Sequence, residues 1–230
     1  MKKESSKLSN SKEVKVMLVS KLLQKYEYNK PIFIEDIFAC LKEYSRQRVY
    51  QLIEEAISCG KLSRYDRGIY YLPTVTEFGP STLSFDEVIC RKFIKDGEEV
   101  FGVYGKYVMD LNFLLSTQVP NTIEIITNKE SRDIRQVEIR GRKVILRKSR
   151  FPINKENEKV YILMEFFNNI DLNEFSKNDL SRKSISDYII SNNIDSNKIY
   201  SLANMFPAKT MKNLAISGVL YEITQQQRSI

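Results

Sequence analysis

Histidine and tryptophan are both absent from this sequence of 230 residues. Without histidine, the chain has no Ser-His-Asp or Cys-His catalytic group, no histidine-ligated zinc site and no side chain that serves as the usual general base at neutral pH. The absence of histidine does not exclude an enzyme that uses carboxylates or lysine. The absence lowers the expectation of an enzyme before any motif is considered.

Cysteine is scarce, with three widely separated residues: Cys40, Cys59 and Cys90. The number is odd, and no two of them have the short spacing of a metal-binding pair. The sequence therefore predicts reduced thiols in a cytoplasmic protein, with no metal site and no cofactor. Cys90 falls on the apolar face of an expected helix, which favours a place in the core over a role as a nucleophile.

Long apolar runs are missing, and none reaches the roughly 20 residues that a membrane-spanning helix needs. Residues 1–10 are polar and rich in lysine and serine, with no apolar segment behind them, so they are not typical of a secretory signal. We expect this basic N-terminus to be disordered or to form an extended arm, and we expect no membrane partner.

Motifs of phosphate-binding loops and metalloproteases are not found. Gly102 and Gly105 are too few for a loop that cradles a phosphate, and the carboxylates Asp110, Glu124 and Asp133 are scattered along the chain. We therefore interpret the chain as a protein without enzymatic activity.

What the chain does contain is an excess of positive charge, +7 at neutral pH, most of it within residues 1–75. This excess weakly favours a polyanionic partner. In the same part of the chain, apolar residues at helical spacing predict a first helix over 12–26 and a second over 35–41, separated by Pro31.

A third helix and a hairpin follow in residues 44–73. Ser45 is a good N-cap for the helix, and Gly60 is suited to end it. Residues 61–72 then alternate in polarity around a turn at 66–68. The apolar face of the helix comprises Val49, Leu52, Ile53, Ala56 and Ile57.

This order of elements predicts an α+β protein with a winged helix-turn-helix domain over residues 11–75. Residues 74–82 follow Pro73, contain Gly79 and Pro80, and show no strong periodicity, so they are expected to connect the domains. A mixed α/β domain is expected over residues 80–230.

Double-stranded DNA is the partner that such a domain predicts. Arginine pairs with guanine and glutamine with adenine in the major groove, while other basic and tyrosine side chains bind phosphates. A solvated helix face, or surface pairing of Asp66 with a neighbouring arginine, would explain the same side chains without DNA. The predicted DNA-binding residues are Ser45, Arg46, Gln47, Arg48, Tyr50, Gln51, Arg64, Tyr65 and Arg67.

The second domain is expected to mix strands and helices. A strand is predicted over 122–127, a hairpin over 135–148, a strand or short helix over 159–167, and a final strand over 219–223. The hairpin predicts a basic surface that adds phosphate contacts or binds an acidic partner, unless it is simply solvated. The residues of this surface are Arg135, Arg140, Arg142, Lys143, Arg147 and Lys148.

A family resemblance extends over about residues 14–150. The segment GIYYLP at 68–73, the pair Tyr104-Gly105, the segment LLSTQVP at 114–120, the strand at 123–127 and the basic hairpin follow one another. Together they resemble the AbiEi-type antitoxins of type IV toxin–antitoxin systems.

The resemblance implies a winged helix that binds operator DNA and represses its own operon, as a possible homodimer on the DNA. It also implies a second domain that counters a nucleotidyltransferase-like toxin encoded beside it, with or without a direct complex. The family's DNA-contacting positions map to Arg46, Gln47, Arg48, Arg64 and Arg67.

The sequence also allows two other interpretations of function. One is a stand-alone winged-helix transcriptional regulator whose C-terminal domain senses a ligand or forms dimers. The other is a protein-interaction module, in which the winged helix holds a partner and the basic sheet meets an acidic surface. An enzyme acting on nucleic acid has only the positive charge in its favour.

Overall fold

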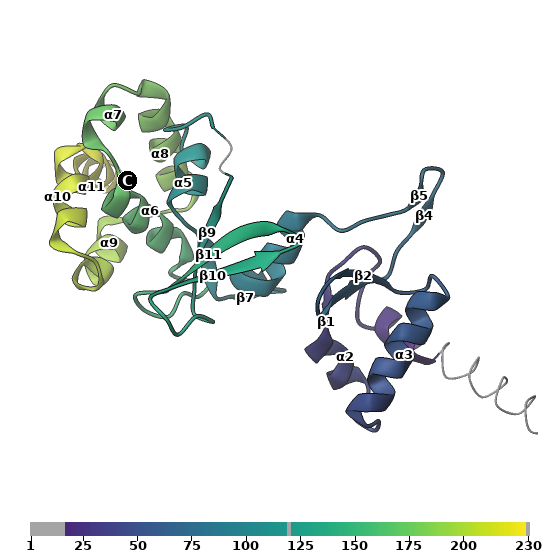
Figure 1. Ribbon diagram of the computed structural model, residues 1–230. Coiled ribbons are helices and arrows are strands. Elements are labelled where there is room, and N and C mark those ends of the chain that lie inside the picture. Colours follow the sequence, from purple (N-terminus) through teal and green to yellow (C-terminus); the bar gives the residue numbers. More distant parts are fainter. Residues whose placement is uncertain (1–16, 119–120, 229–230) are drawn as a thin grey trace, which may run out of the picture. The chain divides into compact units, whose positions relative to one another are not determined.

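The computed structural model describes residues 17–118 and 121–228 (Figure 1). Contacts within the chain divide it into two compact units, Met1–Arg91 and Lys92–Ile230. Both units contain helices and strands, which confirms the predicted α+β class at this level. The expected disordered arm at 1–10 lies outside the described residues.

The first unit combines short helices with a small sheet. After a helix at 17–23 come the strand β1 (Ile32–Phe33), the helices α2 (Ile34–Cys40) and α3 (Arg46–Ser58), and the strands β2 (Ser63–Asp66) and β3 (Ile69–Tyr71). The sheet has the order β1-β3-β2, with both pairs antiparallel. The predicted helices and hairpin are therefore present within the described residues, and residues 12–16 of the first predicted helix lie outside them. The strand β1 was expected only as an apolar entry to a helix.

Local chemistry explains where α3 begins and ends. The Ser45 hydroxyl accepts a hydrogen bond from the Arg48 backbone N–H at 3.3 Å, which satisfies one donor of the first turn. Gly60 follows the helix with a φ of +66°, a conformation that favours glycine. The core residues predicted on this helix are buried, apart from Ile57, which is partly buried.

The apolar residues of the first helix are not all buried. Leu18 and Leu22 are buried, but Leu23 is 40% exposed. Neighbouring residues of a helix point about 100° apart, and in this helix Leu22 faces the core while Leu23 points toward solvent.

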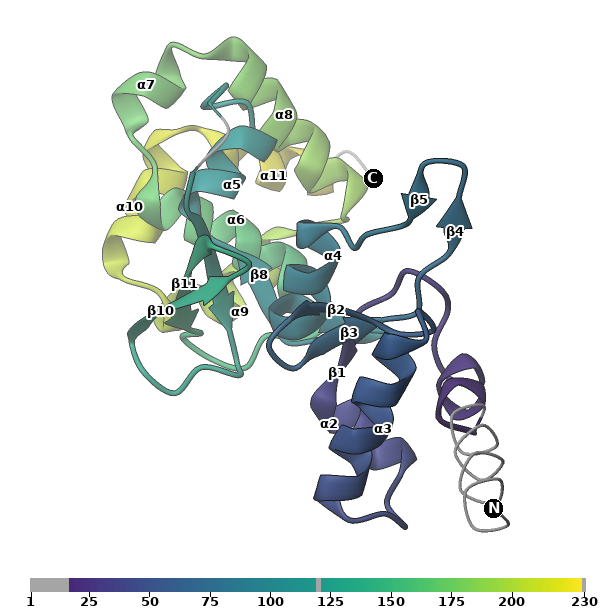
Figure 2. The same cartoon turned by 45° about the vertical axis from the view of Figure 1, so that its right-hand side comes forward.

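Residues 74–82, which the sequence predicted as a connection between domains, form an anchored hairpin. Its strands are β4 (Val75–Thr76) and β5 (Gly79–Pro80). At its base, the Asn29 amide donates to the Thr74 hydroxyl at 3.0 Å, and the Thr74 backbone N–H donates to the Ser81 hydroxyl at 2.9 Å. Figure 2 shows this hairpin projecting away from the β1-β3-β2 sheet, as Figure 1 does from another side.

The first unit also includes the helix α4 (Phe85–Ile89), so the observed boundary lies later than the predicted one at 75–80. The Lys30 ammonium pairs with Glu87 at 2.8 Å, and the Arg91 guanidinium pairs with Asp36 at 3.1 Å. These ion pairs join segments about 55 to 60 residues apart in sequence, which no local pattern encodes.

The second unit is built around a four-stranded sheet with the order β10-β11-β9-β8. The predicted strand and hairpin are confirmed as β9, β10 and β11, and β9 runs parallel to β11. A π-helical turn, η1, and two short strands precede the sheet. The bounds are η1 (Cys90–Ile94), β6 (Lys95–Asp96), β7 (Glu99–Val100), β8 (Gly102–Tyr104), β9 (Ile123–Thr127), β10 (Ile134–Ile139) and β11 (Arg142–Lys148).

Helices complete the second unit, and α6 packs against α5, α9, α10 and β8 (Figure 1). The helices are α5 (Lys106–Asn112), α6 (Glu158–Asn169), α7 (Leu172–Ser176), α8 (Asp179–Ser191), α9 (Ser196–Leu202), the short η2 (Ala203–Met205), α10 (Ala208–Ile216) and α11 (Val219–Arg228).

Two segments of this unit for which the sequence predicted a strand, or left strand and helix open, form helices. The segment 159–167 lies within α6, where apolar residues on nearly all sides are buried; such a run cannot be assigned by periodicity alone. The strand predicted over 219–223 is wrong, because these residues begin α11. Val219 and Ile223 are four residues apart, so on a helix they share one face, and both are buried.

The described part of the LLSTQVP segment, residues 114–118, forms the turn that ends α5. The Asp110 carbonyl accepts hydrogen bonds from the backbone N–H groups of Leu115 and Ser116, at 2.8 and 3.1 Å. The Ser116 hydroxyl accepts from the Gln118 N–H at 3.2 Å. These contacts give the segment a structural role at a helix end.

Within residues 17–118 and 121–228, every helix is too short or too polar to cross a membrane.

Candidate nucleic-acid interface

A recess of about 650 Å³ lies in the first unit where α3, the start of α2 and the β2–β3 hairpin meet. Three of the predicted DNA-binding residues, Tyr50, Arg64 and Arg67, line it together. The complete lining is Ile34, Tyr50, Arg64, Arg67, Gly68 and Tyr70. The fold thus gathers a helix residue and two hairpin arginines into one hollow.

An aromatic contact links this recess to the N-terminal turn of α3. The Tyr50 ring is 50% exposed and meets the Phe38 ring edge-on, with centroids 5.6 Å apart. On the same Phe38 ring lies the Arg46 guanidinium, 5.3 Å from the centroid. Phe38 therefore orients two of the predicted contact residues. The sequence contains no signal for this role, because the turn between α2 and α3 decides which rings meet.

The two hairpin arginines are held differently. Arg64 pairs with Glu54 of α3 and lies over the Tyr70 ring, 5.6 Å from the centroid. Burial acts to lower the pKa of Arg64, but the hydrogen bond to Glu54 and the nearby Tyr70 outweigh it and raise the pKa above its ordinary value. The side chain of Arg67 is exposed and has no hydrogen bond or ion pair with any described residue. Arg67 thus keeps its full donor capacity.

Along α3, the exposed predicted residues separate into two groups. Arg46 and Gln47 lie exposed in its first turn. Arg48 instead donates along the helix to Gln51 at 3.2 Å and to Glu55 at 3.4 Å. Since Arg48 is half-buried and already paired, its predicted role as a phosphate clamp is weakened, and Gln51 is held by the same contact.

Tyr65 is a correction to the predicted site. Its side chain is only 8% exposed, so it does not belong to the surface of the hairpin. Successive side chains of a strand point to opposite faces, and Arg64 takes the exposed face. Ser45 is exposed, and its hydroxyl accepts the N-cap hydrogen bond of α3.

The arrangement suits an extended anion. The N-terminal end of a helix carries a partial positive charge, and Arg46 and Gln47 lie at that end of α3. Guanidinium groups bind phosphate oxygens with two parallel N–H donors, and Arg64 and Arg67 supply such groups at the neighbouring recess. Such an arrangement can bind an anionic ligand and neutralise part of its charge.

The basic surface predicted on β10 and β11 is only partly a surface. Arg147 is half-buried and donates to Glu124 of β9 at 3.0 Å and to Glu165 of α6 at 3.5 Å. The Glu165 carboxylate is 1% exposed and also accepts from Arg150 at 3.3 Å. Beside this network, burial raises the pKa of Tyr161 to about 12. Arg147 therefore has a structural role, because carboxylates of β9 and α6 hold its guanidinium.

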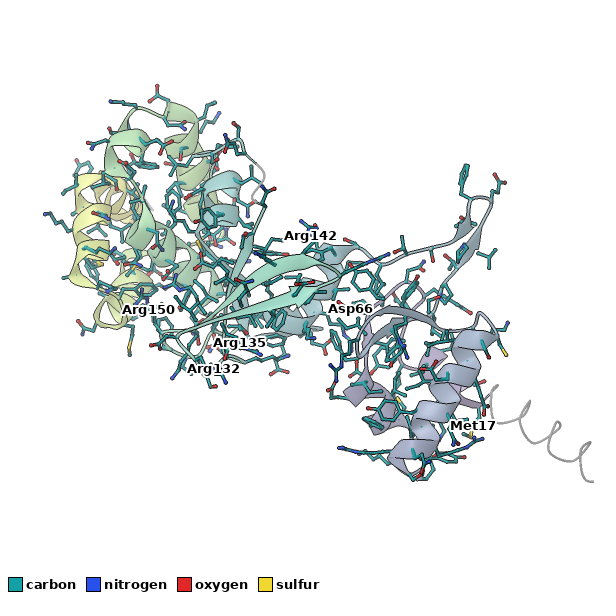
Figure 3. All side chains as sticks on the ribbon, in the orientation of Figure 1. Met17, Asp66, Arg132, Arg135, Arg142 and Arg150 are labelled. Atoms are coloured by element: carbon teal, nitrogen blue, oxygen red, sulfur yellow. The ribbon has the colours of Figure 1, made fainter. Side chains whose placement is uncertain are left out.

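Arg135 is also engaged, because its guanidinium pairs with Glu130 at 2.5 Å. Figure 3 shows Arg142 near the turn of the hairpin, with Arg132 and Arg135 toward its other end. The exposed remainder of the predicted surface consists of Arg140, Arg142, Lys143 and Lys148. These cations are spread along the hairpin rather than gathered around a recess.

Among the residues that the structure describes, no group of three or more cysteine, aspartate or glutamate side chains is placed to hold a metal ion. Cys40, Cys59 and Cys90 are free thiols.

No family model matches this chain. No curated protein matches its sequence either.

Proposed function

We propose that this protein binds double-stranded operator DNA through its first unit, and that it is the antitoxin and autorepressor of a type IV toxin–antitoxin operon. The observation that carries the DNA-binding part is the recess lined by Tyr50, Arg64 and Arg67 beside the exposed first turn of α3. The antitoxin part rests on the resemblance of residues 14–150 to AbiEi-type antitoxins.

The order of elements supports a winged helix-turn-helix as the DNA-binding domain. A helix at 17–23, β1, α2, α3, β2 and β3 follow one another, with β1 added to the hairpin to complete the sheet. In helix-turn-helix proteins the second helix of the motif enters the major groove with its N-terminal residues toward the bases. By that rule, α3 is the recognition helix and Arg46 and Gln47 face the bases.

The hairpin then takes the phosphates. In this mode Arg67 at the turn and Arg64 on β2 bind the backbone beside the groove, and Tyr50 contacts it between them. Glu54 and Glu55 lie further along α3 and pair with Arg64 and Arg48, so both of these cations are held against α3.

Fluorescence anisotropy with the DNA upstream of the chain's own gene tests this mode. Arg67→Ala removes an exposed cation that supports no described contact, so we expect the fold to stay intact and binding to weaken by about 1–3 kcal/mol if it reads a base. If it contacts phosphate, the slope of log K against log salt should fall by about one. Arg46→Ala should act in the same direction.

Lys183→Ala is the matched control, because it removes one exposed positive charge from α8 in the second unit. We expect it to leave the affinity unchanged. Equal binding by Arg67→Ala, Arg46→Ala and the wild-type chain would contradict the assigned surface, and absence of any binding at low salt would contradict DNA recognition itself.

The antitoxin part has a separate test in growth assays. Expression of the neighbouring reading frame alone should stop growth, and co-expression of this chain should restore it. If expression of the neighbouring reading frame does not stop growth, the antitoxin assignment is overturned, but the DNA-binding result still holds. The protein would then be a stand-alone transcriptional regulator.

A further inference from the structure

The β4–β5 hairpin presents an aromatic side chain to solvent on a well-anchored base. Phe78 is 99% exposed and Val75 is 88% exposed. At the tip, the Thr76 hydroxyl donates to the Gly79 carbonyl at 2.7 Å and accepts from the Phe78 N–H at 3.3 Å. The hydrogen bonds of Thr74 and Ser81 hold the other end. Phe78 is therefore an apolar projection on an ordered hairpin.

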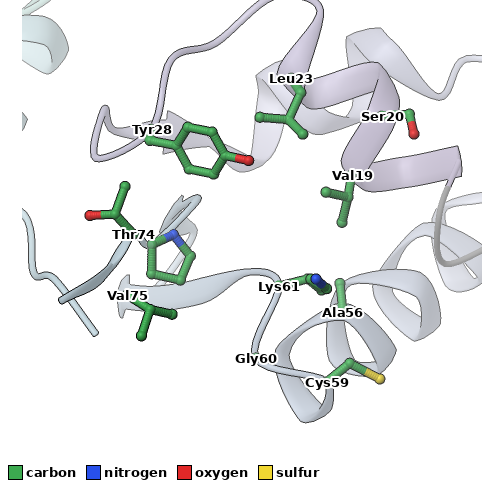
Figure 4. Close-up of a pocket in the computed structure, with 11 residues that line it drawn as sticks. Val19, Ser20, Leu23, Tyr28, Ala56, Cys59, Gly60, Lys61, Thr74 and Val75 are labelled. Carbon is green, nitrogen blue, oxygen red and sulfur yellow. The ribbon is translucent and has the colours of Figure 1, made fainter. Parts of the chain in front are cut away.

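An apolar groove of about 800 Å³ opens in the same unit (Figure 4). Val19 and Leu23 of the first helix lie on one side of it, and Val75 and Lys61 lie on the other. Tyr28 and Ala56 add further apolar lining. Leu23, Tyr28 and Val75 are all exposed, so the groove is accessible to a partner within the described unit.

The charges beside the two features are complementary. Lys61 lines the groove, and Glu77 precedes Phe78 at the hairpin tip. Both side chains are exposed, and neither has a hydrogen bond or ion pair with a described residue. A ligand that carries an aromatic ring next to a carboxylate would satisfy both the groove and Lys61, and the hairpin of a second copy has this pair of groups.

We propose that two copies of this chain dimerise by exchanging their β4–β5 hairpins, with Phe78 of each copy seated in the apolar groove of the other and Glu77 paired with the partner's Lys61. Val75 belongs both to the base of the hairpin and to the rim of the groove. A two-fold axis beside the two rims brings each tip to the partner's groove, which makes the contact reciprocal and closed.

Sedimentation velocity of the full chain without DNA, over a range of concentrations, tests the dimer independently of the proposed function. We expect a concentration-dependent dimer for the wild-type chain. Phe78→Ser removes two buried rings per dimer and should raise the dissociation constant by about 100-fold or more. Because Phe78 is exposed in a single copy, its replacement should leave thermal unfolding unchanged at concentrations where the wild-type chain is monomeric.

Leu180→Ser is the matched control, since it replaces an exposed apolar residue on α8. It should leave the dissociation constant unchanged. A wild-type chain that stays monomeric at about 100 μM, roughly the affinity range of weak complexes, overturns the proposal. A dimer that Phe78→Ser leaves intact overturns it as well.

A charge-reversal cycle tests the pairing directly. Lys61→Glu and Glu77→Lys should each weaken the dimer, and the double variant should recover part of the loss because the pair is restored with opposite polarity. Additive losses in the double variant would contradict the exchange. If the chain did not bind DNA, these measurements would still test the proposed dimer.

Discussion

The β2–β3 hairpin and the β10–β11 hairpin both carry arginines and both turn through a glycine in the left-handed region, Gly68 at a φ of +72° and Gly141 at +76°. Their positions in the sheets differ. β2 is an edge strand in the order β1-β3-β2, whereas β11 lies between β10 and β9. An interior strand has carboxylates available on a neighbouring strand, and Arg147 of β11 finds Glu124 there and Glu165 on the covering helix α6.

An arginine at an edge has fewer such neighbours. The side chain of Arg67, at the turn after β2, has no described hydrogen bond or ion pair, and Arg64 pairs with a single exposed glutamate. The comparison teaches that a count of basic residues in a segment says little about binding. What decides is whether the fold supplies a carboxylate for each cation, because an uncompensated arginine keeps its donors for a ligand.

The largest expected effect is on the interior strand. Arg147→Met leaves Glu165, which is buried, with Arg150 as its remaining described cation, so we expect the free energy of unfolding to fall by about 2–4 kcal/mol. Urea unfolding followed by circular dichroism measures this. Lys143→Met, on the same strand and face but exposed, is the control and should change it by less than about 0.5 kcal/mol. If the two variants were equally stable, Arg147 would have no greater structural role than an exposed cation, and the proposed difference between the two hairpins would be wrong.

A smaller, pH-dependent effect is expected at Glu130. The backbone N–H of Arg132, with the Arg135 guanidinium and the Ser131 N–H, holds the pKa of Glu130 below its ordinary value. A lowered pKa stabilises the folded state above the unfolded pKa, and this contribution is lost as the pH falls through the folded-state value. Glu130→Gln should therefore reduce the unfolding free energy by about 1–2 kcal/mol at pH 7.

The difference between the wild type and Glu130→Gln should shrink as the pH falls below about 4, since the wild-type carboxylate then takes up its proton. Glu138→Gln changes an exposed residue of β10 and should have little effect across the range. A difference that stays constant with pH would show that the Glu130 charge contributes nothing to stability.

The smallest effect on stability is expected at the edge strand. Arg64→Met breaks a pair with Glu54 in which both side chains are about half-exposed, so it should lower the unfolding free energy by no more than about 0.5 kcal/mol. The same variant should weaken DNA binding in the anisotropy assay. A stability loss as large as that of Arg147→Met would show that Arg64 is a structural residue too.

The elements of the first unit were largely predictable, because their signals are local. The N-cap at Ser45, the period of the apolar residues in α3 and the glycine turn of β2–β3 each depend on a few neighbouring residues. The failures have tertiary causes. Residues 74–82 contain turn residues typical of a linker, but hydrogen bonds between Asn29 and Thr74 attach them to the first unit.

The candidate site was predicted in part. Tyr50, Arg64 and Arg67 were named from residue type and position, and the structure brings them to one recess. Tyr65 was assigned to the surface because it neighbours Arg64, although strand alternation turns it inward. The contribution of Phe38 was missed, since its contact with Arg46 and Tyr50 depends on how α2 packs beside α3.

By itself, the sequence determined the positive charge of the first unit, the limits of α3 and the turns of both basic hairpins, since capping, periodicity and glycine conformations act over a few residues. The tertiary structure alone decided which arginines are neutralised. Glu124 and Glu165 reach Arg147 from other elements, while Arg67 lies at a turn where no carboxylate of the described chain pairs with it. Electrostatic pairing depends on the distance between charged groups in space, and the order of residues along the chain does not specify that distance.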